Sequence, residues 1–483
     1  MTAGVTETIA PRTRTQGSLV ACLAFAAMTG SVVAGLGSPI VLEVSVEREV
    51  SISSAQWTLI ITLLVGVICT PVLSRLADGD LKRRVLIGAL LATAVGCAVG
   101  ALVPTFGGLL TGRALQGFGY AMVPLTVSIA RDHLHGVVLA RTMGVLSTSI
   151  AVGVGVGNPV MGLCVLVYDY RAAFGFAFVV SAGGALWAWR RVPVAGVARH
   201  KIRLDPAGAV LLGGGLAGVL LAVARGQVWG WSAPLTVGLG AGGVVLLASW
   251  AVVELRVAAP MVDLRLACAR GLVGVNLTAV LLGINIFGGV AVVLLLAQRP
   301  VEDGVGFGYT VFETGLLMLP MAVASLVCPA MARWLERWMP PRLVLPLGSA
   351  LVTLSFGGFA VWHDRTWHIA AMMGLMGMGI GIAYSAMPAL IVARTPAERT
   401  ASATGINQVL RLMGGAVGAA VMTAVLARYT PPGMHNPLEQ GYVAALAVAC
   451  LAGVVAVLVG CVLVPACDDV HRAEDVDTPV RRD

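Results

Sequence analysis

Two arginines lie inside long apolar stretches of this sequence, where a charged side chain is costly. Arg113 stands well inside one stretch and Arg411 well inside another. A guanidinium placed in the hydrocarbon core of a bilayer is expensive, and it does not titrate near neutral pH. Each arginine is therefore either a fixed charge that faces a cavity and takes part in binding or coupling, or a structural group that donates hydrogen bonds to neighbouring carbonyls.

Each arginine shares a helical face with polar or small residues, because residues three and four apart lie on one side of a helix. The first face comprises Arg113, Gln116, Gly117, Tyr120 and Pro124. The second comprises Asn407, Arg411, Gly414 and Gly418. The second face thus offers a positive charge beside a seam of glycines where helices can approach closely.

Four more side chains are candidates for a substrate cavity. Asn276 and Asn285 lie about 180° apart around a straight helix, so both face one cavity only if the glycines at 283, 288 and 289 distort it. We favour Asn285. Tyr384 and Met387 are about one turn apart, and methionine-lined pockets suit varied apolar ligands. Ordinary packing is the alternative for each.

The composition indicates a protein that crosses a membrane many times. Of 483 residues, 58% are hydrophobic and 12% charged, whereas soluble domains carry about a quarter charged residues. The nine cysteines lie almost all in apolar segments without a CxxC pair, so we expect packing groups and no metal site. The net charge of +8 is spread over loops, and we expect no nucleic-acid partner.

About twenty apolar residues suffice to cross a bilayer as a helix. By that rule the sequence predicts an all-α integral membrane protein with fourteen spans. They lie near residues 18–41, 56–76, 84–104, 107–130, 141–165, 172–190, 207–224, 234–253, 271–296, 312–332, 343–361, 367–392, 403–427 and 441–465.

The distribution of lysine and arginine predicts the orientation, because cytoplasmic loops are enriched in both. Lys82, Arg83, Arg84 and the basic segment 190–206 fall on the side of the N-terminus, so we expect both termini in the cytoplasm and the protein in the plasma membrane. The expected regions are an N-terminal tail (1–17), a six-helix bundle (18–191), a linker with two extra helices (192–254), a second six-helix bundle (255–466) and a disordered tail (467–483).

Motifs of soluble enzymes are missing from the sequence. It has no GxxxxGK[ST] loop, no HExxH, no GxSxG and no dinucleotide fingerprint after a strand. We therefore expect no enzymatic activity, no catalytic residue, no cofactor and no ATP-driven pumping by this chain alone.

Several stretches resemble the major facilitator superfamily, specifically its fourteen-span drug:proton antiporter branch. The run from Ser74 to Arg84 is similar to the loop signature G-x-L-a-D-r-x-G-r-k, with Ser74 and Leu81 in place of glycines. The span 5 run Gly153–Gly162 is similar to the antiporter signature G-P-x-x-G-G, with Asn158 and Leu163 in place of its outer glycines. Further matches are Arg113-x-x-Gln116-Gly117, Leu204-Asp205-Pro-Ala-Gly208, Gly226-Gln-Val-Trp229-Gly230-Trp231, Thr314-Gly315 to Pro320, and Asn407-x-x-x-Arg411 to Gly418.

The resemblance implies a fold and roles for particular residues. The fold is two six-helix bundles plus two additional central helices, and the bundles rock about a site near the midplane. Asp78 becomes a latch that pairs across the gap between the bundles, although a solvated loop acid is the alternative. The residues implied in coupling and gating are Arg113, Asp78, Gly153, Gly157, Pro159, Arg411 and Glu313; those of the substrate cavity are Gln116, Tyr120, Asn158, Asn285, Tyr384, Met387 and Asn407.

The sequence departs from this family in its acids. Such antiporters often carry a carboxylate within the membrane, frequently in span 1, where this chain reads Met28-Thr29-Gly30-Ser31. We find no Asp, Glu or His well inside a span; the nearest are Glu43 and Glu313 at outer ends and Asp78 and Asp132 at inner ends. With two embedded positive charges, the cavity is expected to favour neutral or anionic compounds over lipophilic cations.

The expected function is export of small hydrophobic compounds, such as drugs or antibiotics, by alternating access. The expected partners are the lipid bilayer, a small-molecule substrate and protons as the coupling ion, and we expect a monomer. One alternative is a dedicated transporter of a single anionic or neutral metabolite. An alternative of another class is a transporter-like receptor or scaffold that moves nothing.

Overall fold

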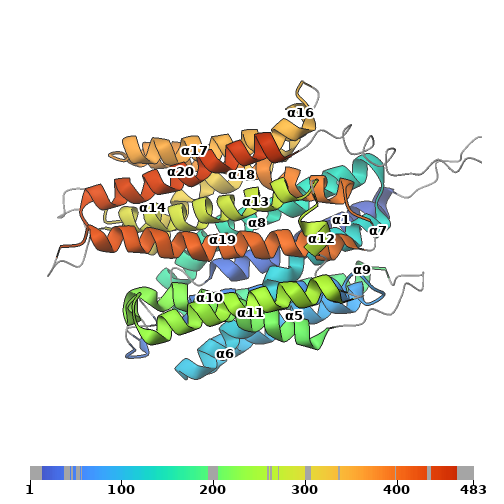
Figure 1. The fold of residues 1–483 in the computed structure, drawn as a ribbon, viewed down its shortest axis with the longest axis horizontal. Helices are drawn as coiled ribbons and strands as arrows, with labels where there is room; N and C mark the ends of the chain where they lie inside the picture. The colour runs from blue at the N-terminus through green and yellow to red at the C-terminus, as the bar shows by residue number, and fades with distance from the viewer. Residues whose placement is uncertain are drawn as a thin grey trace, which may run out of the picture.

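The computed structural model describes the helices and most of the short connections between them. The described residues are 13–36, 44, 47–50, 55, 57–193, 205–257, 260, 264–269, 271–299, 306–335, 338–396, 399–431 and 437–464. Within these ranges the secondary structure is helical, without a strand. The long helices run roughly side by side (Figure 1).

The first half of the chain forms a set of packed helices. They are α1 (Thr13–Gly35), α4 (Trp57–Leu76), α5 (Lys82–Leu102), α6 (Phe106–Gln116), the 3-10 segment η1 (Gly117–Ala121), α7 (Met122–His133), α8 (Gly136–Val167) and α9 (Tyr170–Arg191). Side-chain caps fix where two of them begin: Thr105 accepts a hydrogen bond from the Gly108 amide before α6, and Asp169 accepts two amides at the start of α9.

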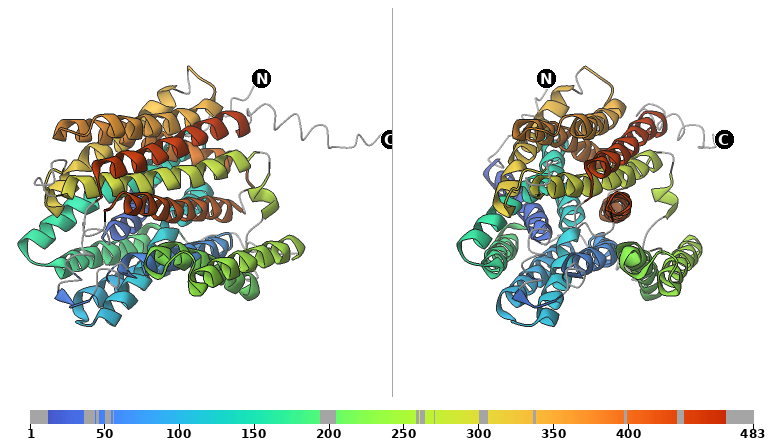
Figure 2. Two further views of the ribbon diagram at one scale, coloured as in Figure 1. Left: turned by 60° about the vertical axis from the view of Figure 1, so that its left-hand side comes forward. Right: turned by 90° about the vertical axis from the view of Figure 1, so that its left-hand side faces the viewer.

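Two helices, α10 (Pro206–Trp229) and α11 (Pro234–Arg256), form a closely packed hairpin between the two halves of the sequence. Asp205 caps α10 and Pro206 occupies its first turn. The helices touch where a Cβ on Gly218 would meet the Leu239 carbonyl oxygen at 2.8 Å and one on Gly243 would meet the Val219 amide at 2.7 Å. Figure 2 shows the hairpin (green) at the edge of the molecule, where α10 packs against both α4 and α19.

The second half of the chain forms another packed set. It contains α12 (Leu264–Ala267), α13 (Val273–Gly283), the π-helical turn η2 (Ile284–Gly288), α14 (Gly289–Gln298), α15 (Val311–Leu317), α16 (Leu319–Leu335), η4 (Pro341–Leu343), α17 (Val344–Val361), α18 (Thr366–Ala393), α19 (Thr400–Arg428) and α20 (Glu439–Leu463).

Each predicted span coincides with a helix or a run of consecutive helices, but the count of fourteen stays a prediction. In the described part of the chain, ten helices are long and apolar enough to cross a membrane. The ranges 56–76, 107–130, 141–165 and 312–332 fall outside these ten. Two of those four are interrupted: the range 107–130 by the 3-10 segment η1 and the range 312–332 at Met318.

Apolar cores lie within each half and between them. One cluster fills the second half around Phe356 and Met376, and two fill the first half. A fourth cluster joins α4, the hairpin and α19 through residues such as Leu64, Leu216 and Leu412. The hairpin therefore contributes to an apolar contact that links the two bundles.

Candidate functional site between the two bundles

Arg113 is fully buried near the end of α6 and is held by oxygen atoms of its own bundle. Its Nε donates to the Thr58 carbonyl at 2.9 Å, and one terminal nitrogen donates to the Gln116 Oε1 at 2.6 Å and to the Val33 carbonyl at 3.4 Å. Thr62 donates in turn to the Arg113 carbonyl at 3.0 Å. In this arrangement Arg113 joins α6 to α1 and α4. Its role in coupling stays a prediction.

The rest of the Arg113 face packs closely against α4. A Cβ on Gly117 would lie 2.8 Å from the Thr62 carbonyl oxygen, and one on Gly66 would overlap the Tyr120 ring. Gln116 is buried, and its amide contacts the Cys97 sulfur at 3.4 Å. Tyr120 also packs against the apolar cluster shared by α4, the hairpin and α19. The predicted roles of Gln116 and Tyr120 in a substrate cavity stay predictions.

Arg411 lies at the boundary between the two bundles. Its guanidinium stacks over the Tyr384 ring, 4.2 Å from the centroid, and donates to the Gln408 Oε1. A small cavity opens beside it, with room for about one water molecule. The cavity is lined by Val123 and Val127 of α7, Tyr384, Pro388 and Ile391 of α18, and Thr404, Asn407, Gln408 and Arg411 of α19.

Asn276 and Asn285 contact two different neighbouring helices. Asn407 donates to the Asn276 Oδ1 at 3.1 Å, so Asn276 reaches the helix that carries Arg411. Asn285 lies in the π-helical turn and donates instead to the Ala449 carbonyl of α20 at 2.9 Å. Asn285, favoured from the sequence, thus faces away from this cavity. Met387 is likewise outside the cavity lining and is fully buried in the core of the second bundle.

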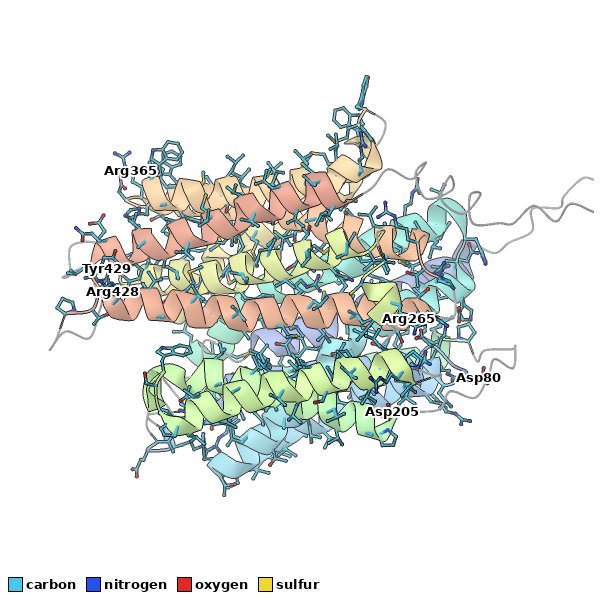
Figure 3. All side chains as sticks on the ribbon, viewed as in Figure 1. Asp80, Asp205, Arg265, Arg365, Arg428 and Tyr429 are labelled. Atoms are coloured by element: carbon cyan, nitrogen blue, oxygen red, sulfur yellow. The ribbon has the colours of Figure 1, made fainter. Side chains whose placement is uncertain are left out.

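Asp78 connects the two bundles at one end of the molecule. We call this the Asp80 end, after the neighbouring residue, which is labelled in Figure 3. The Asp78 carboxylate accepts the backbone amide of Ala401 at 2.9 Å, the Ser402 amide at 3.2 Å and the Ser402 hydroxyl. Since α19 begins at Thr400, Asp78 caps its N-terminus from the other bundle.

Two more contacts close the Asp80 end. Arg131 of α7 donates to the Thr400 hydroxyl and to the Pro396 carbonyl at 3.5 Å. A Cβ on Gly405 would lie 2.8 Å from the Cβ of Ser74, so α19 and α4 meet there at backbone distance. Burial raises the pKa of Asp78 to about 6, while its hydrogen bonds with Ser402 and the charge of Arg75 act in the opposite direction. At pH 7 the carboxylate is therefore mostly ionised.

Replacing Asp78 by asparagine is expected to loosen the Asp80 end. The variant loses the charge that the amides of α19 contact, which costs about 2 kcal/mol and shifts the closed-to-open ratio roughly 30-fold. The measurement is the rate at which a hydrophilic maleimide modifies a cysteine placed at Thr404, in a background without native cysteines.

Asp80→Asn is the matched control, because it removes an exposed acid from the same loop. We expect it to leave the labelling rate of the cysteine at position 404 unchanged. Equal labelling in Asp78→Asn and the unaltered background would show that the Asp78 contact does not hold this end closed.

The glycine-proline helix α8 packs closely against α1 and the second bundle. Cβ atoms on Gly153 and Gly157 would meet α1, at 2.9 Å from the Met28 carbonyl and 3.3 Å from the Val32 Cα. One on Gly162 would lie 2.8 Å from the Phe312 Cα. The helix continues through Asn158 and Pro159, and the Asn158 side chain lies outside the described residues. The gating role of this helix stays a prediction.

Of the two acids expected at outer ends, the structure describes Glu313. Glu313 is exposed and closes a capping box with Thr310 at the start of α15, accepting the Thr310 amide at 2.9 Å. The predicted part of Glu313 in coupling stays a prediction. Glu43 lies outside the described residues.

Sequence reasoning missed a third buried arginine, Arg225. It was expected to follow span 7, but α10 continues to Trp229, so Arg225 lies within the helix. Its guanidinium stacks 4.5 Å from the centre of the Trp57 ring, and the residue is 6% exposed. The position of Gly230, with φ of +91°, would have located this helix end, because glycine readily adopts that conformation.

These features define a helical membrane protein in which two packed bundles meet at a small cavity lined by polar and apolar side chains. The chain matches the model of the Major Facilitator Superfamily over residues 19–419 and belongs to that superfamily. Its members are transporters and not enzymes.

Curated relatives are similar over most of the chain. The cephamycin export protein CmcT of Amycolatopsis lactamdurans is 27% identical over 364 residues, 73% of each chain. The puromycin resistance protein pur8 of Streptomyces alboniger is 29% identical, covering 79% of this chain and 76% of its own. The multidrug resistance protein Stp of Mycobacterium tuberculosis (strain ATCC 25618 / H37Rv) is 26% identical, covering 76% and 67%.

A solved structure shares the fold. The human organic anion transporter MFSD10 (TETRAN) aligns with a TM-score of 0.64, covering 93% of this chain and all of its own. At 14% sequence identity, this similarity concerns the fold alone.

Proposed function

We propose that this protein exports small hydrophobic compounds, among them drugs or antibiotics, by alternating access driven by the inward proton gradient. The observation that carries this proposal is the small cavity beside Arg411, which lies between the bundles and has room for about one water molecule. Because a substrate cannot fit in this arrangement, the bundles must separate to admit it. The names of the export and resistance relatives support export as the direction.

The proposed orientation places the Asp80 end in the cytoplasm, with the protein in the plasma membrane, fourteen spans and both termini inside. The basic residues Lys82, Arg83 and Arg84 lie at this end, beside Asp78, in keeping with the enrichment of positive charge in cytoplasmic loops. The Asp78 contact with α19 then closes the cytoplasmic entrance, and its release opens it.

Proton coupling requires a group that binds and releases a proton during transport. In the described part of the chain, each Asp, Glu or His that lies in a long helix occupies its first or last turn. Asp78, with its pKa raised to about 6 by burial, is the candidate for proton exchange at the Asp80 end. The buried arginines favour a second candidate function, transport of one anionic metabolite.

The test is the retention of a panel of dyes and antibiotics in pump-deficient cells that express the protein, with and without a protonophore. We expect lower retention of several compounds, restored by the protonophore. The Asp78→Ala variant is expected to lose this effect, and Asp80→Ala to keep it. If the well-expressed protein alters no compound's retention, polyspecific export is wrong; loss of one anionic compound alone would favour the metabolite transporter.

A further inference from the structure

The charge of Arg411 is buried between the bundles without a carboxylate partner in the described residues. Arg411 is 5% exposed. Among those residues it forms no ion pair, and its one hydrogen bond goes to the neutral amide oxygen of Gln408. A guanidinium has five N–H donors in a planar fork, so most of its donors remain available to a ligand in the adjoining cavity.

The cavity has one polar and one apolar side. Thr404, Asn407, Gln408 and Arg411 follow at three- and four-residue intervals, so they present one face of α19. Val123 and Val127 of α7, from the other bundle, and Ile391 of α18 supply the apolar side. A compound with a charged group at one end and an apolar body at the other matches this division.

The positive charge of Arg411 favours an anionic ligand over a cationic one. A buried positive charge without an acid is unfavourable by itself, and an anionic ligand relieves that cost when it binds. The planar guanidinium donates two parallel hydrogen bonds to a carboxylate, whereas it repels a cation. The Tyr384 ring, at 4.2 Å from the guanidinium, fixes the plane of the fork.

We propose that the transported compounds are lipophilic carboxylates, and that Arg411 binds their carboxylate group while α7 and α18 contact the apolar body. This inference rests on the proposed function and narrows its substrate class. Asn407 lies one turn before Arg411, and its contact with Asn276 links the site to α13.

An anionic substrate also changes the energetics of export. Each carboxylate that leaves the cell alone carries one negative charge outward, and a potential that is negative inside favours this movement. Export can therefore draw on the membrane potential without a titrating group inside the membrane. The cavity residues named above include no Asp, Glu or His.

The first test is equilibrium binding to the full chain in nanodiscs, with three probes that share a naphthalene body. They are naphthoate, neutral naphthamide and cationic naphthylmethyl-trimethylammonium. We expect the unaltered protein to bind naphthoate about tenfold more tightly than naphthamide, and the cation more weakly still. Equal or tighter binding of the cation by the unaltered protein overturns the inference, and this comparison needs no variant.

The second test assigns the preference to Arg411. Arg411→Gln is expected to lower naphthoate affinity about tenfold with little change for naphthamide, and Arg411→Lys to restore part of the preference. Arg225→Gln is the matched control, because Arg225 is a buried arginine outside the cavity. This variant is expected to keep the preference for naphthoate over naphthamide. If Arg411→Gln weakens both probes equally, the residue is structural and the inference fails.

Transport by proteoliposomes separates this inference from the proposed function. Valinomycin is used to impose a potential of about 60 mV, oriented to favour exit of the anion. This potential is expected to raise the equilibrium concentration ratio of naphthoate across the membrane about tenfold, with no effect on that of naphthamide. Transport of neutral or cationic compounds that is independent of Arg411 would refute the carboxylate class but leave export standing. Movement of no compound at all would refute the proposed function.

Discussion

Replacing Arg113 by methionine is expected to abolish transport while leaving a folded protein. The side chain makes two hydrogen bonds to carbonyls of other helices, Thr58 at 2.9 Å and Val33 at 3.4 Å. Hydrogen bonds to a charged group contribute about 1.5–3 kcal/mol each. Losing both therefore lowers the equilibrium constant that favours this packing of α1, α4 and α6 by about 100-fold or more. Methionine fills much of the space, and apolar replacement of buried charge is often tolerated.

The measurements are compound retention in cells and the melting temperature of the purified protein. Arg225→Met is the control, because it removes a buried arginine from the hairpin α10–α11 instead; we expect it to keep transport. Arg113→Lys is expected to recover little, since one ammonium cannot reproduce the geometry of the fork. Full transport by Arg113→Met would show that transport does not need the hydrogen bonds of Arg113 to the Thr58 and Val33 carbonyls.

Much of the fold follows from local properties of the sequence. Long apolar runs marked the helices, and Pro104 and Asp169 separate α5 from α6 and α8 from α9 close to the bounds of the predicted spans. Helix ends were less predictable, because they depend on how far a helix packs against its neighbours. The α10 helix continues past Arg225, whose guanidinium stacks on the ring of Trp57, a residue far away in the sequence.

The sequence predicted which residues matter at the site, but it did not predict which groups they contact. The cost of a buried charge identified Arg113 and Arg411, but nothing local indicates that Arg113 turns towards α1 and α4. A straight helix predicts opposite directions for Asn276 and Asn285, and they do contact different helices. Which of them approaches Arg411 depends on how α13 packs between α19 and α20. This is a tertiary property, and the spacing of residues along one helix does not predict it.

Replacing Gly414 by leucine is expected to prevent correct packing of the second bundle. A Cβ at this position would lie 2.8 Å from the Val280 carbonyl carbon and 3.0 Å from its Cα. Cβ atoms on Gly283 and Gly418 would likewise meet the backbone of the facing helix, so α13 and α19 cross at backbone contact. Small residues of this kind allow helices to associate within membranes, and overpacking such a contact costs about 3 kcal/mol.

The measurement is the fraction of protein that elutes as a single species in detergent, together with its melting temperature. Gly88→Leu is the matched control: Gly88 also lies in a membrane helix, but a Cβ there would have no neighbouring atom within 4 Å, so leucine extends outward. We expect Gly414→Leu to lower the folded fraction about tenfold or more, with Gly414→Ala between the two. Because the Arg411 carbonyl lies against Gly283 in the same crossing, separation of the helices also displaces Arg411 from Tyr384. A Gly414→Leu protein that folds and retains Arg411-dependent binding of naphthoate would therefore show that this crossing neither limits stability nor positions the guanidinium.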